Sequence, residues 1–524
     1  MSTLLLAFVL AASYYLYSKR NAGKHFPPGP KPFPILGNIF DLTTHELWVR
    51  ITNWSRLYGD IMYIHVFGQG LVFCNTAEVA TDLLDKKGSI YSDKPHLIMT
   101  GDLCGCENMV AMTRYGDKSR RQRRLMTQAL SANACKNYRP LLANESLTLI
   151  RRMVSDPSKY LAYLRWYAGG LTLQSIYGYR ADSPEDPFLM LGMDCVDILS
   201  NKIASGGGIW PVDLFPFLRH LPSWAPGAGF LRKAVVWKAK MEEFVDRPYE
   251  LVKQRMREGT AVPCFVTTLL EDIRDGKEAS EFDAQRDFDI RWTANSMYSA
   301  SMDTTITVVS HFMLAMLTRP DVLAKAQSEM DTVVGSSRLP TFSDRASLPY
   351  LECVMSEVLR WGVPVPMGLP HRLMEDDVYN GQFIPAGTLV FANIWNMLRN
   401  EELYPNADAF IPERYLEKPP KHLNLSEAEE QEWAKERNPR NYVFGFGRRV
   451  CPGSHLIEES LWIVMATMIA TLDLDWTRDE RGKVIKQKIT FDNAVFRTPS
   501  PFECDIRPRS EQALRLLNSV ESSL

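Results

Sequence analysis

The stretch FGFGRRVCPG, residues 444–453, places one cysteine among three glycines and two arginines. Glycine allows backbone conformations and close approaches that a side chain would forbid. A zinc site, a disulfide or a nucleophilic cysteine needs partners, namely further ligands at a fixed spacing, a second cysteine or a histidine base. Only His455 is such a residue nearby. Cys451 therefore suits a different task, as the single thiolate ligand of a metal that another group already holds.

The residues around Cys451 favour haem iron as that metal. Pro452 suits the first turn of a helix, which would put the sulfur at a helix amino terminus, where the dipole favours a thiolate. Arg449 supplies a cation for a haem carboxylate. The glycines Gly445, Gly447 and Gly453 leave room for a close approach. The sequence thus indicates a haem protein with Cys451 as axial ligand.

Composition limits the other possibilities. The chain has 524 residues and a formal net charge of -2, so its overall charge does not suggest a nucleic-acid partner. Nine scattered cysteines suit a reducing compartment better than a disulfide framework. The CGC at 104–106 lacks a second ligand pair and does not predict zinc. Length alone would predict two or three domains.

The amino terminus predicts a membrane anchor. Residues 2–17 carry no charge and are followed by Lys19, Arg20 and Lys24. A cleavable signal peptide is the alternative, with AAS at 11–13 as the cleavage site, but no basic residue precedes the apolar run. We expect an uncleaved single-pass anchor over residues 1–20, with the body of the protein in the cytosol. The proline-rich residues 21–38 should form a stiff hinge after it.

Apolar periodicity predicts a mainly helical body. Two short alternating runs, 61–67 and 71–74, flank Gly68 and Gly70 and predict a hairpin. The apolar residues 206–230 are broken by prolines and glycines, which indicates either a core loop or an exposed flap that touches a membrane or an apolar ligand. Long amphipathic helices are expected near 140–155, 230–257, 283–318, 347–361 and 454–472.

Residues 444–453 resemble the cysteine-ligand loop of the cytochrome P-450 superfamily. Its pattern FxxGxRxCxG is met by Phe444, Gly447, Arg449, Cys451 and Gly453. Three upstream segments are similar to further family motifs. They are the ExxR pair Glu357 and Arg360, Arg414 in FIPERYL, and Asp303 and Thr304 in ANSMYSASMDTT. The whole pattern looks most like microsomal-type fungal members that act in specialised metabolism.

The resemblance implies the fold and the roles of these residues. It implies a mainly α fold with small β-sheets, in which residues 39–524 form a single haem-thiolate monooxygenase domain. Haem b would be bound through Cys451, with Phe444 and Gly447 beside it and Arg449, Arg123 and His371 at its propionates. Asp303 and Thr304 would relay protons to O2, and Glu357, Arg360 and Arg414 would form a buried structural network. Electrons would come from NADPH through a separate haemoprotein reductase, because the chain has no GxGxxG fingerprint.

The chain departs from the family pattern at three positions. Ser301 replaces a usual glycine, Ser119 replaces a tryptophan that bonds a propionate, and Ile457 replaces a small residue. Two alternatives therefore stay open. One is a haem-thiolate isomerase or dehydratase that needs no reductase, against which the retained Thr304 argues. The other is a non-catalytic haem-binding protein, motivated by Ser119 and Ser301.

The resemblance also suggests the substrate and the surroundings of the enzyme. The positions that match the family's pocket lining are small or apolar: Ser299, Ala300, Val363–Leu369, Ala494 and Val495. They suit a neutral lipophilic molecule, such as a terpenoid or polyketide intermediate of fungal secondary metabolism. We expect the protein at the endoplasmic reticulum membrane, with residues 206–230 dipping into the bilayer. The basic cluster for docking an acidic electron donor would be Lys118, Arg120, Arg121 and Arg124.

Overall fold

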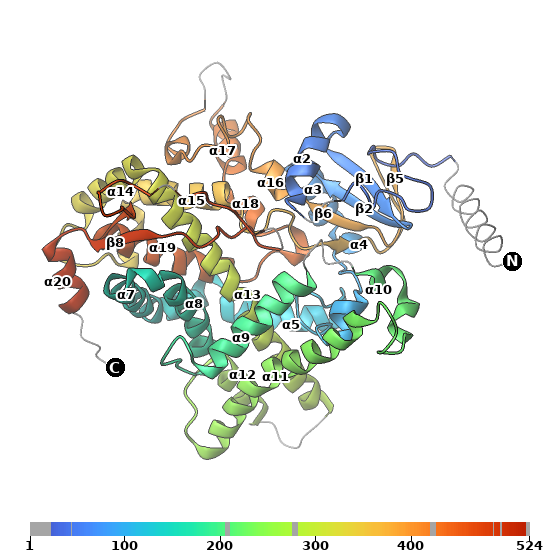
Figure 1. Cartoon of the computed structure of the whole chain (residues 1–524), viewed down its shortest axis with the longest axis horizontal. Helices are drawn as coiled ribbons and strands as arrows, with labels where there is room; N and C mark the ends of the chain where they lie inside the picture. The colour runs from blue at the N-terminus through green and yellow to red at the C-terminus, as the bar shows by residue number, and fades with distance from the viewer. Residues whose placement is uncertain are drawn as a thin grey trace.

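The computed structural model describes residues 23–42, 45–204, 210–274, 281–419, 426–485, 487–492 and 495–519. Most of these residues are helical, and a small sheet lies to one side of the helices (Figure 1). The longer helices are α2 (Leu47–Tyr58), α5 (Asp117–Leu130), α7 (Arg139–Ser155), α8 (Tyr160–Tyr177), α9 (Pro187–Asp197), α11 (Gly229–Glu258), α12 (Phe265–Arg274), α13 (Glu281–Thr318), α14 (Pro320–Val333), α15 (Pro349–Gly362), α17 (Glu427–Glu436), α19 (Ser454–Thr471) and α20 (Glu511–Ser519). Short helices are α3 (Ala77–Ala80), α4 (Gly88–Tyr91), α6 (Ala132–Cys135), α10 (Pro211–Leu214), α16 (Ile394–Met397) and α18 (Arg440–Val443).

The predicted long helices are confirmed as α7, α11, α13, α15 and α19. Their ends follow local chemistry. Helix α11 ends at Gly259, whose φ of 70° places it in the left-handed conformation that glycine adopts without strain. Pro349 opens α15, where a missing N–H costs nothing because the first turn has no intrahelical partner for it. The mainly α architecture with small sheets is therefore confirmed.

A four-stranded sheet in the order β1-β2-β6-β3 lies beside the helices. The predicted hairpin is confirmed as β1 (Ile61–Val66) and β2 (Gln69–Cys74), which pair antiparallel with Ile61 opposite Cys74. Its turn residues Phe67 and Gly68 both have positive φ, as a two-residue hairpin turn requires. The other strands are β3 (His371–Arg372), β4 (Asp377–Tyr379), β5 (Gln382–Ile384), β6 (Leu389–Ala392), β7 (Leu472–Trp476) and β8 (Cys504–Pro508).

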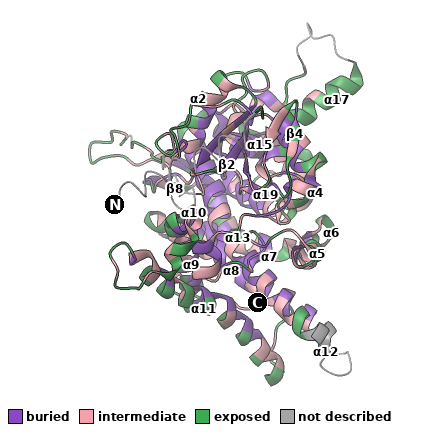
Figure 2. Ribbon diagram, turned by 90° about the vertical axis from the view of Figure 1, so that its right-hand side faces the viewer, coloured by how far each residue is buried: buried purple, intermediate pink, exposed green. Residues whose placement is uncertain are grey.

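Helix α13 runs through the middle of the molecule and is shared by two hydrophobic cores (Figure 2). One core takes α13 from Ile290 to Met302 and packs it against α5, α8, α9, α11 and α12. The other takes it from Ile306 to Leu317 and packs it against α7, α8, α14, α15 and α19. Neither core includes residues 303–305, so the predicted oxygen-binding segment lies where the two cores meet.

The expected anchor over residues 1–20 lies outside the described residues. Among those that are described, one helical segment, Ala284–Thr318, is long and apolar enough to cross a membrane. Because this segment is the largely buried core helix α13, it is no anchor. The hinge prediction needs correction from residue 23 onward. The Tyr63 amide donates to the Pro28 carbonyl at 3.0 Å, so this part packs on β1 instead of acting as a free spacer.

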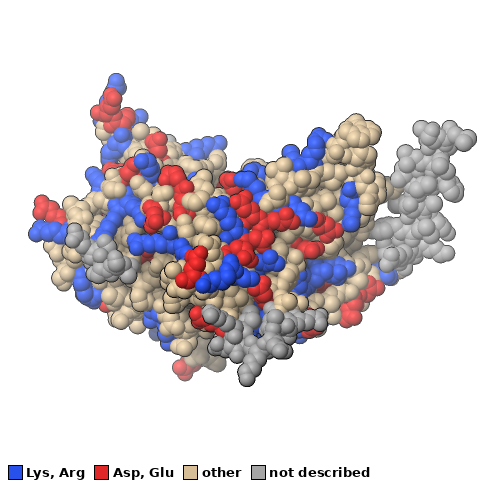
Figure 3. Space-filling model, turned by 90° about the horizontal axis from the view of Figure 1, so that it is seen from below, with Lys and Arg blue, Asp and Glu red and all other residues tan. Residues whose placement is uncertain are grey.

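Acidic and basic side chains are interspersed on the face that Figure 3 shows. Red and blue groups alternate across its centre, and no patch of a single sign covers this face. The two signs of charge are therefore interspersed on this face, in keeping with the formal net charge of -2.

Candidate haem-thiolate site

The Cys451 loop is held by its own backbone. The Cys451 amide donates to the Phe444 carbonyl at 2.8 Å, and Gly447–Arg449 form one 3₁₀ turn between them. The sequence predicted Pro452 in the first turn of a helix. Helix α19 begins only at Ser454, so Pro452 lies in the turn before the helix. The amides of Gly453 and Ser454 nevertheless donate toward the sulfur. The helix start thus stabilises a thiolate, although through a different arrangement from the expected one.

Position 447 requires glycine because another segment of the protein lies too close for a side chain. Its φ is 56°, and a Cβ at this position would lie 2.1 Å from the carbonyl oxygen of Leu84. The loop therefore packs on the turn Thr81–Lys86, which lies far away in the sequence. By contrast, a Cβ on Gly453 would meet the Cys451 sulfur at an ordinary 3.9 Å. The close approach inferred for Gly447 is real, but its partner in the structure is Leu84.

Cys451 differs from every other cysteine of the chain. The other eight are buried, whereas Cys451 is exposed. Even so, desolvation by the surrounding protein raises the pKa of its thiol, against the amides of Gly453 and Ser454 and the charge of Arg123, which lower it. A side chain that is both accessible and desolvated faces an opening within the protein. An axial ligand needs such a position, and a core cysteine would not have it.

A cationic cluster, which we define as Lys94, Arg123, His371 and Arg449, gathers next to this loop. Arg449 donates to the carbonyls of Ser92 at 2.8 Å, Thr113 at 2.7 Å and Val110 at 3.4 Å. A guanidinium has five N–H groups, so these three bonds leave two for another acceptor. The Arg123 Nη2 donates to the Val450 carbonyl at 2.6 Å, directly beside Cys451.

Lys94 is the member of the cluster that the sequence reasoning missed. It is buried, and its ammonium donates to the carbonyls of Leu369 and Pro370, both at 3.1 Å. Burial and the charges of Arg449 and Arg123 hold its pKa well below the ordinary value. The lysine follows Asp93 in the segment YSDKPH, and a buried cation in a loop gives no periodic signal that would reveal it.

His371 is the uncharged member of the cluster, whose positive charge comes from the other basic side chains. Its Nδ1 lies 2.7 Å from the Tyr91 carbonyl and must donate to that oxygen. Burial, followed by the charge of Lys94, holds its pKa well below the usual range.

Ser119, the departure from the family pattern, does not replace the missing tryptophan. Its hydroxyl donates to the Gly116 carbonyl at 3.1 Å and accepts from the Gly116 amide at 3.2 Å, so it caps α5.

The cluster fits the carboxylates of haem. Asp93 is the carboxylate that faces it, but Asp93 also pairs with Arg114 and Arg372, at 3.1 Å each. Positive charge within the cluster is therefore incompletely neutralised by the protein, and buried uncompensated charge is costly. A ligand with two carboxylates would compensate it, while Cys451 offers a sulfur for the metal. Both halves of the donor set thus match haem.

The departure at Ser301 is accommodated by α8. Its hydroxyl lies 2.6 Å from that of Thr172 on α8 and also bonds the Tyr298 carbonyl. Thr304 keeps a separate role, because its hydroxyl donates to the Ala300 carbonyl at 2.9 Å. This is the bond back along the helix that can loosen α13 locally. Serine at 301 therefore engages α8 and leaves the bonding of Thr304 intact.

Asp303 lies at the same junction of the two cores. Burial raises the pKa of its carboxyl, although a hydrogen bond from Ser200 and the charge of Arg165 lower it in part. Arg165 is exposed on α8, so a partly buried acid lies close to a group that reaches solvent. The arrangement suits an acid that exchanges protons between solvent and the interior.

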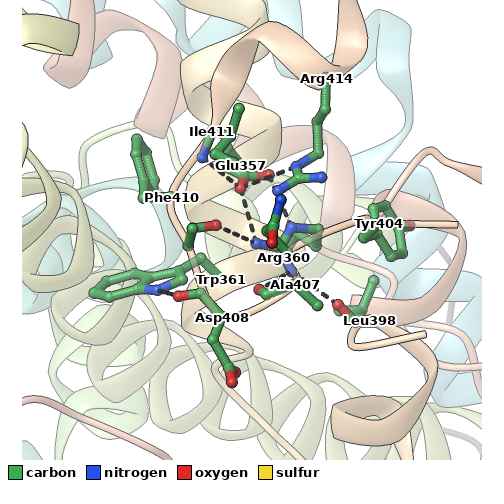
Figure 4. A network of polar contacts seen from close by, with 12 residues as sticks. Glu357, Arg360, Trp361, Leu398, Tyr404, Ala407, Asp408, Phe410, Ile411 and Arg414 are labelled. Atoms are coloured by element: carbon green, nitrogen blue, oxygen red, sulfur yellow. Dashed lines mark hydrogen bonds and ion pairs between the residues drawn. The ribbon is translucent and has the colours of Figure 1, made fainter. Parts of the chain in front are cut away.

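Glu357, Arg360 and Arg414 form one buried network (Figure 4). Arg360 donates to both carboxylate oxygens of Glu357 at 2.8 Å. Its remaining N–H groups reach the carbonyls of Leu398, Ala407 and Ala409 at 3.0, 2.7 and 3.1 Å. All five donors of the guanidinium are therefore used, which a lysine with three donors could not achieve. Arg414 adds a bond to Glu357 at 3.2 Å.

The residues predicted to line the substrate pocket are only partly described by the structure. Ala300 is exposed and its neighbours Ser299 and Ser301 are partly exposed, and Leu369 is 41% exposed, as expected of residues that line an opening. Ala494 lies outside the described residues.

The basic cluster on α5 is largely engaged by the protein itself. Arg120 pairs with Asp117, Arg121 pairs with Asp289, and Lys118 bonds Asn108. Of the four, Arg124 alone has neither an ion pair nor a side-chain hydrogen bond with a described residue.

Comparisons with known proteins agree with this geometry. The sequence profile described as Cytochrome P-450 matches residues 27–504. The chain is 40% identical to cytochrome P-450 monooxygenase claT of Ampulloclitocybe clavipes, over 99% of this chain and 98% of that protein. It is 38% identical to claR of the same fungus, over 98% of this chain and 91% of the relative. Monooxygenase 208 of Postia placenta is 37% identical, over 98% and 96%.

Proposed function

Because the chain belongs to the cytochrome P-450 family and is a haem-thiolate monooxygenase, we propose that it hydroxylates a neutral lipophilic intermediate of fungal secondary metabolism. The proposal depends above all on Thr304, whose hydroxyl lies in the break between the two cores. An isomerase or dehydratase that rearranges its substrate without outside electrons would not need a proton-delivering alcohol there. Full-length similarity to several monooxygenases also favours the oxygenase over a non-catalytic haem protein.

Each group of residues in the site has a separate role in the proposed reaction. Bound haem would supply the iron on which O2 is reduced, and thiolate ligation favours O–O cleavage. Cys451 would hold the metal, with its charge stabilised by the amides of Gly453 and Ser454. The cationic cluster would bind the two carboxylates and fix the orientation of the ring. Asp303 would take up protons from solvent, and Thr304 would pass them on inside the site.

Electrons must come from a partner protein. We propose an NADPH-dependent haemoprotein reductase that docks on the side of the Cys451 loop. Because most of the basic groups of α5 are engaged, we assign this contact to the exposed Arg124 and Arg448. Arg448 donates to the Tyr115 hydroxyl but pairs with no carboxylate of the described residues. Oxidation of NADPH by purified reductase, stimulated by the holoprotein, tests the assignment and excludes an isomerase that needs no electrons.

Replacing Thr304 by alanine should uncouple the reaction. The expected variant keeps the spectrum of thiolate-ligated haem, because the axial ligand is untouched, but consumes NADPH with hydrogen peroxide as the main product. We expect product formation to fall about 10²-fold, the contribution typical of a positioned proton donor. Thr305→Ala, one residue further along the helix and buried, is the matched control. Fully coupled turnover in the Thr304 variant would show that the relay assignment is wrong.

The structure sharpens the proposal for membrane contact. In the described part of 206–230, Trp210 and Phe215 are turned inward, since the Trp210 indole donates to the Ile203 carbonyl at 2.8 Å and Phe215 packs on Phe67. Phe217 and Trp224 are 67% and 81% exposed instead. Ile209 lies outside the described residues. We therefore propose Phe217 and Trp224 as the side chains that enter the bilayer of the endoplasmic reticulum.

A polarity-sensitive dye attached through Phe217→Cys should be quenched by a lipid-soluble quencher when the full chain is reconstituted in phosphatidylcholine vesicles. The same dye at Leu514→Cys, on helix α20 at the opposite end of the molecule (Figure 1), should not be. The physical reason is that large exposed apolar side chains are stabilised by transfer into lipid. Equal quenching at the two positions would contradict the proposed contact.

The substrate class rests on chemistry alone. The described residues of the predicted pocket lining carry no charged group, and Ser299 is their one hydroxyl. A terpenoid or polyketide skeleton suits such a lining. Incubating holoenzyme, reductase and NADPH with extracts of fungal metabolites, and searching by mass spectrometry for products that gain one oxygen atom, tests this part of the proposal.

A further inference from the structure

Arg497 lies in the carboxyl-terminal segment FRTPSPF and forms no ion pair with a described residue. Its guanidinium is buried against the ring of Phe491 at 3.5 Å and the ring of Trp395 at 4.8 Å. Burial lowers its pKa to about 10, and its Nε has no hydrogen-bond partner in the described part of the chain. Burying a cation without a carboxylate costs free energy, so we expect Arg497 to have a role that offsets this cost.

The bonds that Arg497 does make join three segments. Its Nη1 lies 3.1 Å from Nε2 of His311 on α13 and 3.1 Å from the Gly362 carbonyl at the end of α15. Its amide donates to the Pro364 carbonyl at 3.0 Å. The next residue, Thr498, places its hydroxyl 2.6 Å from that of Thr307 on α13. One residue thus connects α13, the segment after α15 and the carboxyl-terminal hairpin that pairs Phe491 with Pro499.

His311 is built to accept this bond. Its Nδ1 lies 2.8 Å from the Thr307 carbonyl, so Nδ1 carries the proton and Nε2 accepts from Arg497. Burial and the charge of Arg497 lower the pKa of His311 to about 3, which keeps it neutral. The ring stacks on Phe491 at 5.8 Å, and a Cβ on Gly362 would lie 2.9 Å from it. Gly362 is therefore needed to admit the ring.

Val363 is strained at the centre of these contacts. It adopts φ 42° and ψ 76°, a left-handed conformation that is an outlier for a β-branched residue. Such strain persists only where the surroundings determine the backbone fully. Arg497 bonds the carbonyls on both sides of Val363, at Gly362 and Pro364. The strained residue also begins the segment that ends at Leu369 and Pro370, whose carbonyls bind Lys94 of the cationic cluster.

We infer that Arg497, through His311 and the carbonyls of Gly362 and Pro364, is the positioning residue that sets the shape of the substrate pocket. His311 lies two helical turns beyond Thr304, so the contact also fixes the hairpin relative to the oxygen-binding segment. The inference rests on the proposed function, because the three joined segments carry the residues assigned to the pocket. It adds a specificity-determining residue that does not itself touch substrate.

The test measures pocket shape without the natural substrate. Three azoles are titrated into the holoenzyme and followed by the haem spectrum: imidazole, and the isomers 1-phenylimidazole and 4-phenylimidazole, which have the same size but carry the phenyl ring at different positions. In Arg497→Gln and in His311→Phe we expect the ratio of the Kd values of the two phenylimidazoles to change about fivefold, as for one lost buried hydrogen bond. The Kd of imidazole should change by less than about twofold, because it is too small to sense the walls.

Arg437→Gln is the matched control, since Arg437 is also buried and lies over an aromatic ring, Trp433 at 4.1 Å, but contacts none of the three segments. It should leave the ratio unchanged. Amide hydrogen exchange should become faster in 361–370 and 490–502 in the two test variants alone. If Arg497→Gln does not fold, His311→Phe decides, because it keeps an aromatic ring at this place but loses the acceptor for Arg497 together with the Nδ1 donor to Thr307.

An unchanged ratio in a folded test variant, or an equal change in Arg437→Gln, would overturn the inference. Failure of the proposed function would look different. In that case wild-type holoprotein would lack imidazole binding at the iron or would oxidise no NADPH with reductase, whatever the variants do to the phenylimidazoles.

Discussion

Replacing Cys451 by alanine will abolish both the thiolate-type haem spectrum and all reductase-supported turnover. Cys451 is the exposed cysteine of the chain, it lies beside Arg123, and the amides of Gly453 and Ser454 point at its sulfur. Without the sulfur no side chain of the loop can donate electron density to the iron. We expect the reduced, carbon monoxide-bound protein to lose the red-shifted Soret band that marks thiolate ligation, and product formation to fall below detection.

The variant should still fold and bind some haem. The loop is held by the bond from the Cys451 amide to the Phe444 carbonyl and by the packing of Gly447 on Leu84, neither of which needs the sulfur. The cationic cluster also remains for the carboxylates. Cys353→Ala, at a buried cysteine of α15, is the control and should keep spectrum and turnover. A thiolate spectrum in Cys451→Ala would show that another residue is the ligand.

Local motifs allowed much of the site to be predicted. The ligand loop, the ExxR pair and the pair of Asp303 and Thr304 are each short in sequence. Glu357 and Arg360, three residues apart on a helix, must also share a face. The long helices followed from apolar periodicity, although α15 and the second half of α19 are buried on nearly all sides. The hairpin from Ile61 to Cys74 followed from alternation and from glycines in its turn.

What could not be predicted depends on contacts between distant segments. Lys94 belongs to the site only because its loop folds back onto the carbonyls of Leu369 and Pro370. The purpose of Gly447 could not be seen, because its partner Leu84 lies hundreds of residues earlier. Basic residues on α5 suggested a docking patch, but the carboxylates that engage them come partly from α13. Charge in a sequence does not reveal which groups a fold neutralises.

The ExxR network illustrates the difference between a motif and its strength. In sequence, Glu357 and Arg360 are an i,i+3 pair, and such pairs at a surface contribute about 0–1 kcal/mol. In the structure both side chains are completely buried, and Arg414 shares the same carboxylate. Burial makes the expected loss of stability much larger than this surface value. An arginine left without its counter-charge can neither reach water nor find another acceptor.

Glu357→Gln should therefore cost about 3–5 kcal/mol of unfolding free energy. The amide is the same size as the carboxylate, so little packing is lost, but Arg360 and Arg414 keep their charges without compensation. The bonds from Arg360 to Leu398, Ala407 and Ala409 would weaken with it, which loosens the segment before the ligand loop. Guanidinium unfolding of the holoprotein, followed by the thiolate Soret band and by tryptophan fluorescence, measures the loss.

The matched control is Glu352→Gln on the same helix. Glu352 also pairs with two arginines, Arg345 at 2.6 Å and Arg440 at 3.4 Å, but its side chain is 32% exposed. Water can compensate the arginines there, so we expect a loss of about 1 kcal/mol or less. Equal losses in the two variants would mean that the number of ion pairs, and not their burial, determines the effect. A much larger loss for Glu357→Gln would show that the ExxR motif stabilises this fold because burial leaves its two arginines no other counter-charge.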